Sequence, residues 1–205
     1  MDKLSIDQFR RMLDVALLSV SEKSDYFSQL DAVTGDGDHG TAIVTALKAA
    51  VEASRGGSDF KTVLNDMGFG VMLNTSGSTS TLLGGFFLGM GEGSEGAELD
   101  AARIKTMFMS GLEAVVKNTK AKVGDKTMMD ALMPAVDAIV ACDSEDIKHI
   151  LSAGANAARN GAAATVSMRA NFGRARNYGE RSVGSMDAGA SSWACMFEAF
   201  SKSIE

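Results

Sequence analysis

The sequence predicts an all-α protein of about eight amphipathic helices and no sheet. Apolar residues recur with the period of an α-helix along most of the chain, and no segment alternates with the period of two that marks a half-buried strand. The 205 residues include a single proline, whereas strand-rich folds use proline in their many turns. Alanine, methionine and leucine, which favour helices, are abundant.

Composition and length limit the classes of protein to consider. Hydrophobic residues make up 45% of the chain, and the length suits a single domain over residues 1–205. A net charge of −6 argues against nucleic acid as the main partner.

No apolar run approaches the roughly 20 residues of a membrane span, and the charged N-terminus is not a signal peptide, so we expect a cytoplasmic protein. Cys142 and Cys195 lie in apolar runs, which favours free thiols over a disulfide.

The helices can be placed by their apolar stripes and their ends. The first is expected to begin at Ser5, because Gln8 three residues later completes a capping box. A loop follows it, and the fourth helix opens at the glycine and hydroxyl residues of 74–80. Pro134 lies in the sixth helix, either as a kink or near the first turn. The other helices are expected at about 41–54, 59–73, 100–118, 127–142, 145–165 and 190–203.

The stretch TGDGDHGTA at residues 34–42 is a candidate metal site. Asp36 and Asp38 are two residues apart, so both project to the same side of an extended loop, and Asp31 can reach the same point from the preceding segment. Three close carboxylates repel one another unless a cation lies between them. Their hard oxygen atoms favour Mg²⁺ or Ca²⁺ over zinc, and the glycine and glutamate of an EF-hand are missing.

Two alternatives remain at this stretch. The aspartates could serve only as caps for the helix that begins near Thr41. His39 could be a metal ligand, a phosphate contact or an orienting residue, and the last two are favoured because magnesium prefers oxygen ligands.

A second candidate is NTSGSTSTLLGG at residues 74–85, directly before an apolar helix. Unpaired N–H groups at a helix start attract anions, and small residues allow a phosphate to approach. Ser76, Ser78, Thr79 and Ser80 can also donate hydrogen bonds. The stretch is not a P-loop, because no Gly-Lys-Ser/Thr follows. The alternative is an ordinary Ser/Thr N-cap.

Two later stretches also carry polar groups at predicted helix starts. In GDKTMMDAL (124–132), Lys126 is expected near the start of the following helix, which a neighbouring aspartate or threonine can cap. In GRARNYGERSVGSMDAGA (173–190), Asp187 is expected to cap the last helix, and three arginines can complement phosphate. These arginines are Arg174, Arg176 and Arg181. The region 166–189 exceeds the usual loop length, which indicates a functional loop.

These stretches, in this order, resemble the nucleotide-binding L subunit, or L domain, of dihydroxyacetone kinases (the DhaL family) over essentially the whole chain. The family pattern LDAxxGDGDHG is reproduced at 30–40, GDKTMxDAL at 124–132, and GRAxxxGERSxGxxDxGA at 173–190. The phosphate-binding GGASGPLYG aligns with SGSTSTLLG at 76–84, where hydroxyl residues replace several small ones. A second departure is an alanine after Asp187, where the family usually has proline.

The resemblance implies a barrel of eight antiparallel helices whose loops at one end hold a nucleotide, ATP or ADP, through two Mg²⁺ ions. Carried over residue by residue, it makes Asp31, Asp36 and Asp38 the metal ligands and part of the catalytic set. Arg181 is expected to supply an extra cation for catalysis. Nucleotide contacts are expected from His39, Ser76, Gly77, Ser78, Thr79, Leu82, Thr127, Met128, Arg174 and Asp187.

The resemblance also implies phosphoryl transfer to dihydroxyacetone or a related short ketose, such as a tetrulose. In the family, a histidine on a separate K-type subunit or domain holds the ketone covalently. Such a transfer depends on positioning and charge neutralisation more than on a protein nucleophile. The donor is either Mg-ATP or a bound ADP that a phospho-carrier protein of the sugar phosphotransferase system recharges. The sequence does not distinguish between these two donors. It also does not distinguish a monomer from a homodimer.

Two other hypotheses remain. In the first, the protein is a catalytically weak Mg-nucleotide-binding subunit with a regulatory or interaction role, because Ser76, Ser78 and Thr81 crowd the terminal phosphate. In the second, the chain is a helical bundle whose aspartates only cap helices.

Overall fold

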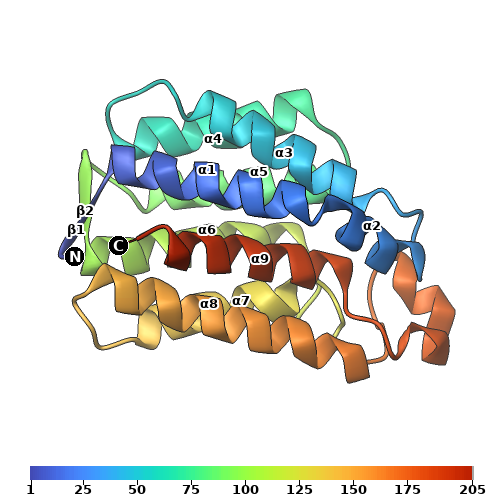
Figure 1. The fold of residues 1–205 in the computed structure, drawn as a ribbon. Coiled ribbons are helices and arrows are strands. Elements are labelled where there is room, and N and C mark those ends of the chain that lie inside the picture. The colour runs from blue at the N-terminus through green and yellow to red at the C-terminus, as the bar shows by residue number, and fades with distance from the viewer. Residues whose placement is uncertain (205) are drawn as a thin grey trace.

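The computed structural model describes residues 1–204 (Figure 1). Its helices are α1 (Ile6–Glu22), α2 (Ser24–Ala32), α3 (His39–Ala53), α4 (Phe60–Asn74), α5 (Ser78–Glu92), α6 (Ala101–Asn118), α7 (Met129–Ala141), α8 (Ile147–Ala164) and α9 (Ala188–Lys202). Two 3₁₀ segments lie between α8 and α9, at Thr165–Ser167 and Arg174–Ser182. The predicted helices are confirmed to within a few residues, apart from α2.

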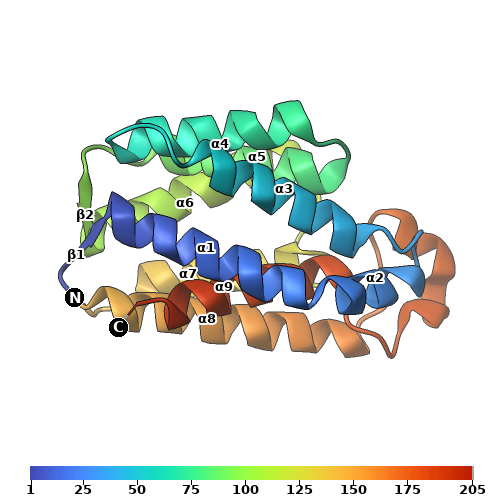
Figure 2. The ribbon, with the colours of Figure 1, turned by 45° about the horizontal axis from the view of Figure 1, so that its top comes forward.

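The helices alternate in direction and close into a ring. Helix α1 packs on α3, each later helix packs on the next, and α9 returns to α1. Only Lys23 separates α1 from α2, so these two helices form one broken rod, and eight antiparallel rods make up the ring (Figures 1 and 2). The all-α barrel is therefore confirmed.

Helix α9 lies deepest in the structure. Every residue from 191 to 197 is buried, which is the pattern of a helix surrounded by protein on all sides. The Trp193 ring meets that of Phe86 of α5 edge-on, with centroids 5.0 Å apart, and Phe197 lies 5.8 Å from Phe108 of α6. These aromatic contacts hold the start of α9 in place against the core.

A small antiparallel sheet closes the end of the ring where the chain begins, which corrects the expectation of no sheet. Strand β1 (Lys3–Ser5) pairs with β2 (Glu98–Asp100), and the buried side chains of Leu4 and Leu99 lie opposite each other. Strands of three residues are too short to show an alternating pattern in the sequence.

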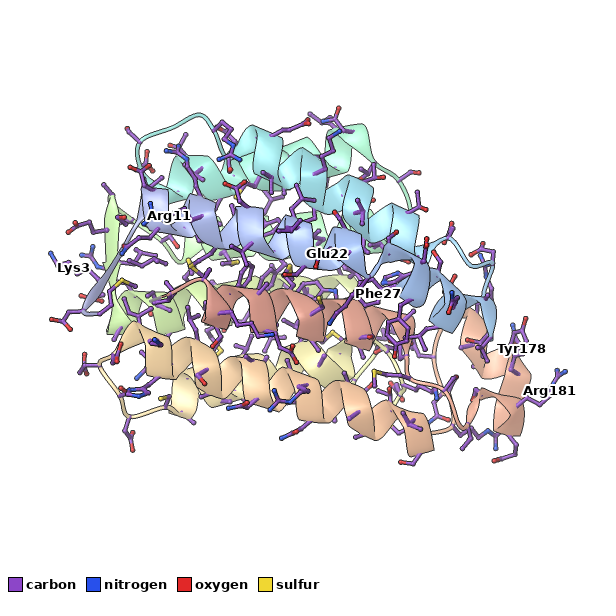
Figure 3. The ribbon with its side chains drawn as sticks, viewed as in Figure 1. Lys3, Arg11, Glu22, Phe27, Tyr178 and Arg181 are labelled. Carbon is purple, nitrogen blue, oxygen red and sulfur yellow. The ribbon has the colours of Figure 1, made fainter. Side chains whose placement is uncertain are left out.

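Helix α2 was expected to be part of a loop. Among its nine residues only Phe27 is buried, so no apolar stripe marks it in the sequence (Figure 3). Helix α2 packs tightly against α3. Gly40 allows this close approach, because a Cβ at residue 40 would collide with the carbonyl oxygen of Ser24. As a result Asp31 lies in the last turn of α2 and His39 at the start of α3.

Two expectations from composition concern membranes and thiols. No helix within residues 1–204 combines the length and apolarity that crossing a membrane requires. Cys195 is buried, Cys142 is partly buried, and both are free thiols in the described chain, as predicted.

The single proline influences how α7 and α8 pack. Pro134 lies inside α7, and its ring nitrogen cannot donate a hydrogen bond to the carbonyl of Asp130. Gly161 of α8 lies against that carbonyl, so closely that a Cβ would collide with the oxygen. The proline leaves a carbonyl free at the helix surface, and the glycine allows α8 to approach it.

We expect Gly161→Ala to destabilise the fold by about 1–3 kcal/mol, because the new methyl group forces α8 away from α7. Helix propensity alone would favour alanine by about 1 kcal/mol, so the predicted change in the free energy of unfolding is opposite to the change that propensity predicts. Urea unfolding measures the change, and Asn160→Ala on the exposed face of the same turn is the control. A Gly161→Ala variant as stable as the wild type would contradict the packing argument.

Candidate functional site

A cavity of about 560 Å³ opens at the end of the ring opposite the sheet. Its walls come from the loop before α3, the start of α5, the loop before α7 and the loop before α9. Because the rods alternate in direction, α3, α5, α7 and α9 all begin at this end (Figure 1). Helix starts present free N–H groups and the positive ends of helix dipoles, so the cavity is suited to anions.

The helix caps differ between the two ends of the ring. Helices α1, α4, α6 and α8 begin at the far end, and each has a side-chain N-cap. By contrast, no described side chain caps α3 or α5 from its N-cap position. In α3 the Gly40 N–H already donates to Ser28 Oγ at 3.2 Å, so it is mainly the first N–H groups of α5 that are available to a ligand in the cavity.

Asp31, Asp36 and Asp38 converge on one wall of this cavity, as predicted. One carboxylate oxygen from each lies within 4.8 Å of the others. The loop closes because Asp31 Oδ2 accepts a hydrogen bond from the Gly37 backbone N–H at 2.8 Å. Gly35 leaves room for this carboxylate, since a Cβ at residue 35 would displace the Asp31 side chain. This set of hard oxygen donors fits Mg²⁺.

The structure does not support the alternative that Asp38 serves as a cap for α3. Asp38 occupies the N-cap position of α3, yet its side chain accepts no hydrogen bond from the start of that described helix. Partial loss of hydration, followed by the nearby charge of Asp36, raises the pKa of Asp38. The carboxylates thus repel one another, and a cation bound between them would relieve that repulsion.

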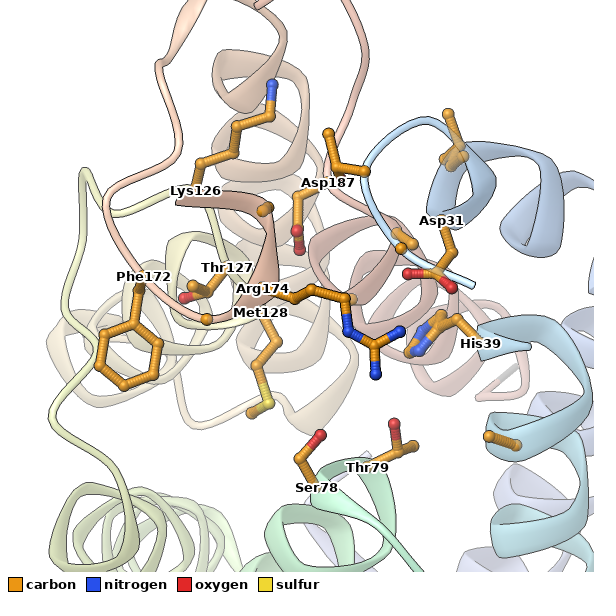
Figure 4. A pocket seen from close by; sticks show the side chains of 18 of the residues that line it. Asp31, His39, Ser78, Thr79, Lys126, Thr127, Met128, Phe172, Arg174 and Asp187 are labelled. Carbon is orange, nitrogen blue, oxygen red and sulfur yellow. The ribbon is translucent and has the colours of Figure 1, made fainter. Parts of the chain in front are cut away.

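Arg174 reaches into the cavity and contacts this carboxylate cluster. Its Nη1 atom lies 2.5 Å from Asp36 Oδ2, and this hydrogen bond lowers the pKa of Asp36. Figure 4 shows the guanidinium between His39 on one side and the side chains of Ser78 and Thr79 on another. Without a metal, Arg174 therefore supplies the positive charge that faces the cluster.

His39 is oriented by α9. Its Nε2 atom lies 2.9 Å from Ser192 Oγ, and the Ser192 hydroxyl donates to the carbonyl of Gly189 at 3.0 Å. A hydroxyl has one hydrogen, so Nε2 donates to Ser192 and Nδ1 stays free as an acceptor. Burial lowers the pKa of His39 and keeps the ring neutral, although Asp31 and Asp38 oppose this. The geometry is compatible with both roles that the sequence favoured for this histidine, a phosphate contact and an orienting residue.

The start of α5 forms the floor of the cavity. Gly77 takes the N-cap position with φ of 92°, a conformation that favours glycine. The hydroxyls of Ser80 and Thr81 each donate to the carbonyl four residues earlier, at 2.9 and 3.1 Å. The side chains of Ser78 and Thr79 line the cavity instead (Figure 4). An anion placed here would meet free backbone N–H groups and two hydroxyls.

Asp187 caps α9 as predicted, because it accepts the Ala190 N–H at 2.7 Å. Its own N–H donates to Thr165 Oγ1 at 2.9 Å, which ties the start of α9 to the end of α8. The carboxyl lies deep in the site, and burial raises its pKa to about 7, although the charge of Lys126 opposes this.

Ser80 and Arg176, which the sequence offered as possible phosphate donors, lie outside the cavity lining. All but one of the residues expected to bind metal or nucleotide, or to act in catalysis, line it. The exception is Arg181, which lies outside the described lining, with its guanidinium 5.4 Å from the centroid of the Tyr178 ring (Figure 3). Arg174 is the arginine that faces the carboxylates.

Three further residues were not predicted from the sequence: Phe172 and Trp193 line the cavity, and Ser192 holds His39. Phe172 directly precedes the GRA motif, and this position was the signal from which its place in the site could have been predicted.

Comparison with known proteins defines the class to which this fold and cavity belong. The family model described as the DAK2 domain matches residues 33–202. The chain therefore belongs to the DAK2 domain, or DhaL, family.

Among its relatives are two bacterial subunits. The chain is 34% identical to "PEP-dependent dihydroxyacetone kinase 2, ADP-binding subunit DhaL" of Listeria innocua, over 86% of this chain and 85% of the relative. It is 30% identical to "PEP-dependent dihydroxyacetone kinase, ADP-binding subunit DhaL" of Escherichia coli, over 87% of each chain.

Longer relatives contain a region similar to this chain. It is 34% identical to the D-erythrulose kinase of Mycolicibacterium smegmatis, over 90% of this chain and 33% of that protein. The dihydroxyacetone kinase of C. freundii, solved in complex with AMP-PNP and Mg²⁺, is similar with a TM-score of 0.71 and 25% identity, over 95% of this chain and 33% of that one. The chain thus spans about a third of these two proteins.

The raised pKa of Asp187 leads to a pH-dependent stability. Its pKa rises from 3.8 to about 7 on folding, so the folded protein keeps a proton that the unfolded chain releases between these values. This group therefore lowers stability as pH rises through that window, by at most about 1.4 kcal/mol per pH unit, and has no further effect above it. Asp187→Asn keeps the capping oxygen, so urea unfolding should show its stability relative to wild type increasing with pH up to about 7. A pH-independent difference would count against the burial of this carboxyl.

The ion pair between Arg174 and Asp36 predicts an effect on metal binding. We expect Arg174→Gln to strengthen Mn²⁺ binding to the nucleotide-free protein by up to about fivefold, because a competing cation is removed from an exposed carboxylate. Arg181→Gln lies on the same loop outside the cavity and should leave the affinity unchanged. Fluorescence or calorimetric titration measures both, and equal effects of the two variants would refute this assignment.

Proposed function

We propose that this protein is the nucleotide-binding subunit of a dihydroxyacetone-type kinase. It transfers a phosphoryl group from Mg-ATP, or from a bound ADP that has been recharged, to dihydroxyacetone or a related short ketose on a separate K-type subunit in the cytoplasm. One observation carries the proposal: three converging carboxylates beside the start of α3 share a single cavity with the uncapped start of α5. Carboxylates alone would repel a phosphate, so the combination suits a metal–nucleotide complex.

Each wall of the cavity has a part in this proposal. Asp31, Asp36 and Asp38 would hold two Mg²⁺ ions, which would supply positive charge to neutralise the phosphates. The start of α5 binds phosphate oxygens through its free N–H groups, with Ser78 and Thr79 as further donors. His39 orients the ligands on the α3 side, while Thr127, Met128 and Asp187 line the opposite wall.

Arg174 has two roles in this scheme. In the structure it pairs with Asp36. With a metal held by the carboxylate cluster, the guanidinium would be available to a phosphate group, because its two parallel N–H groups can donate to two phosphate oxygens.

The acceptor is proposed to come from outside this chain. His39 is neutral and held by Ser192, and the other histidine, His149, lies 3.4 Å from Asp146 at the far end of the ring. His149 lies far from the carboxylates, and His39 lies beside them in the part of the cavity assigned here to the nucleotide. The chain therefore contributes nucleotide binding and charge neutralisation, which are the main requirements of phosphoryl transfer.

The names of the relatives support the finer parts of the proposal. DhaL relatives at 30–34% identity are named ADP-binding subunits of PEP-dependent kinases, and a similar one in Lactococcus lactis is named PTS-dependent. These names support a resident ADP recharged by a phospho-carrier protein. The erythrulose kinase from Mycolicibacterium smegmatis supports a tetrulose as an alternative acceptor.

A second candidate is a catalytically weak nucleotide-binding subunit with a regulatory role. Its support is the presence of Ser76 and Ser78 in the cavity lining, where the family pattern has glycine and alanine. Thr81 does not add to this crowding within the described site, because its hydroxyl donates to the Gly77 carbonyl. The cavity keeps about 560 Å³, which favours the active subunit.

Asp36→Ala should lower phosphoryl transfer at least about 100-fold, because one of the proposed metal ligands is lost. The assay combines the purified protein, a K-type subunit, Mg²⁺ and either ATP or ADP with the phospho-carrier system, and compares trioses with tetruloses. Asp25→Ala, on the exposed first turn of α2, is the control and should retain activity. Equal activity of the two variants would remove the metal-site hypothesis. A wild-type protein that binds nucleotide and never transfers phosphate would favour the regulatory role.

A further inference from the structure

We propose that Lys126 is a positioning residue that orders the Arg174 loop, defined here as residues 165–187, and so sets where Arg174 enters the cavity. The effect on loop order follows from the contacts of Lys126 alone. Its consequence for nucleotide binding rests on the function proposed above.

The turn that carries Lys126 is built to direct its side chain away from the cavity. Asp130 accepts the backbone N–H of Gly124 with Oδ1 at 2.6 Å and that of Thr127 with Oδ2 at 2.8 Å. Between them Lys126 has φ of 60°, a conformation that residues with side chains rarely adopt. Figure 4 shows the ammonium pointing away from Arg174, Ser78 and Thr79.

The Lys126 ammonium makes three hydrogen bonds, all of them to the Arg174 loop. Lys126 is 3% exposed, and its Nζ donates to the carbonyl oxygens of Thr165 at 2.8 Å, Met168 at 3.2 Å and Ser185 at 2.6 Å. An ammonium has three hydrogens, so none is left for a phosphate. Although the stem of this lysine lines the cavity, the charge acts on the protein backbone.

These three carbonyls lie at the two ends of the Arg174 loop. Thr165 and Met168 follow α8, and Ser185 precedes α9, so a single ammonium joins the segments between which Arg174 projects. Other bonds hold the same ends, among them Gly184 N–H to the Val166 carbonyl at 2.8 Å. That bond joins the loop to itself, whereas Lys126 joins it to the turn before α7, as the Asn171 N–H also does through the Asp125 carbonyl at 3.1 Å. Lys126 is the residue of this turn that holds both ends of the loop.

Removing the ammonium leaves three backbone carbonyls without this donor. We therefore expect its loss to release the loop and also the turn that Asp130 forms. Lys126→Met keeps the length of the stem and removes all three hydrogen bonds. The matched control is Lys105→Met, because Lys105 Nζ donates to the Cys142 carbonyl at 2.5 Å at the far end of the ring. Both variants lose a lysine-to-carbonyl contact, and only one lies at the cavity.

Hydrogen exchange read by mass spectrometry tests the claim on loop order. In Lys126→Met we expect exchange in peptides covering 165–187 to accelerate about tenfold or more relative to wild type, with peptides from α4 and α9 changed no more than in Lys105→Met. Trypsin should also cleave faster after Arg174, Arg176 and Arg181. Wild-type exchange in the loop of a folded Lys126→Met protein would overturn the proposal. If that variant does not fold, Lys126→Gln is measured by the same criteria.

A double-mutant cycle separates positioning from general destabilisation. Lys126→Met should weaken Mg-ADP binding about tenfold in the wild type and much less in an Arg174→Gln background, because the two residues act through one contact. Additive losses would show that Lys126 does not act through Arg174 and would refute the positioning role. Should the wild-type protein bind no Mg-ADP, the proposed function fails, and the hydrogen-exchange result still decides the role of Lys126 in the loop.

Discussion

The alternation of helix direction around a closed ring is the constraint on which the site depends. Rods that alternate must place every second helix start at the same end, so α3, α5, α7 and α9 all begin around one cavity. Their dipoles attract anions, and so do the free N–H groups at the uncapped start of α5. The carboxylates of Asp31, Asp36 and Asp38 at the same end repel anions. A metal–nucleotide complex satisfies both groups at once.

The site is assembled from loops, and buried polar contacts hold those loops in place. Gly35 leaves room for the Asp31 carboxylate, Asp187 caps the buried helix α9, and Lys126 joins the loop before α7 to the loop before α9. The rigid core under the loops comes from α9, whose aromatic side chains contact α5 and α6. Core packing therefore determines where the loops start and end, and polar contacts determine their path between those points.

The local parts of this arrangement were predictable from sequence, and the long-range parts were not. The carboxylate cluster was predictable because Asp36 and Asp38 are neighbours, and most helix bounds followed from apolar stripes. Helix α2 was missed because Phe27 is its only buried residue. The contact of His39 with Ser192 spans 153 positions, so no spacing rule could reveal it. Arg181 was expected in the cavity because nothing local shows how the Arg174 loop bends.

Calorimetric titration of the wild-type protein with ADP, in excess Mg²⁺ and in EDTA, tests the central claim most directly. The claim is that the carboxylate cluster and the helix starts bind one ligand together. We expect clear binding with Mg²⁺ and an affinity at least about 100-fold lower in EDTA, because the phosphates then face the carboxylate cluster with no metal ion between them. Equal affinity in both conditions, or no binding in either, would contradict the account.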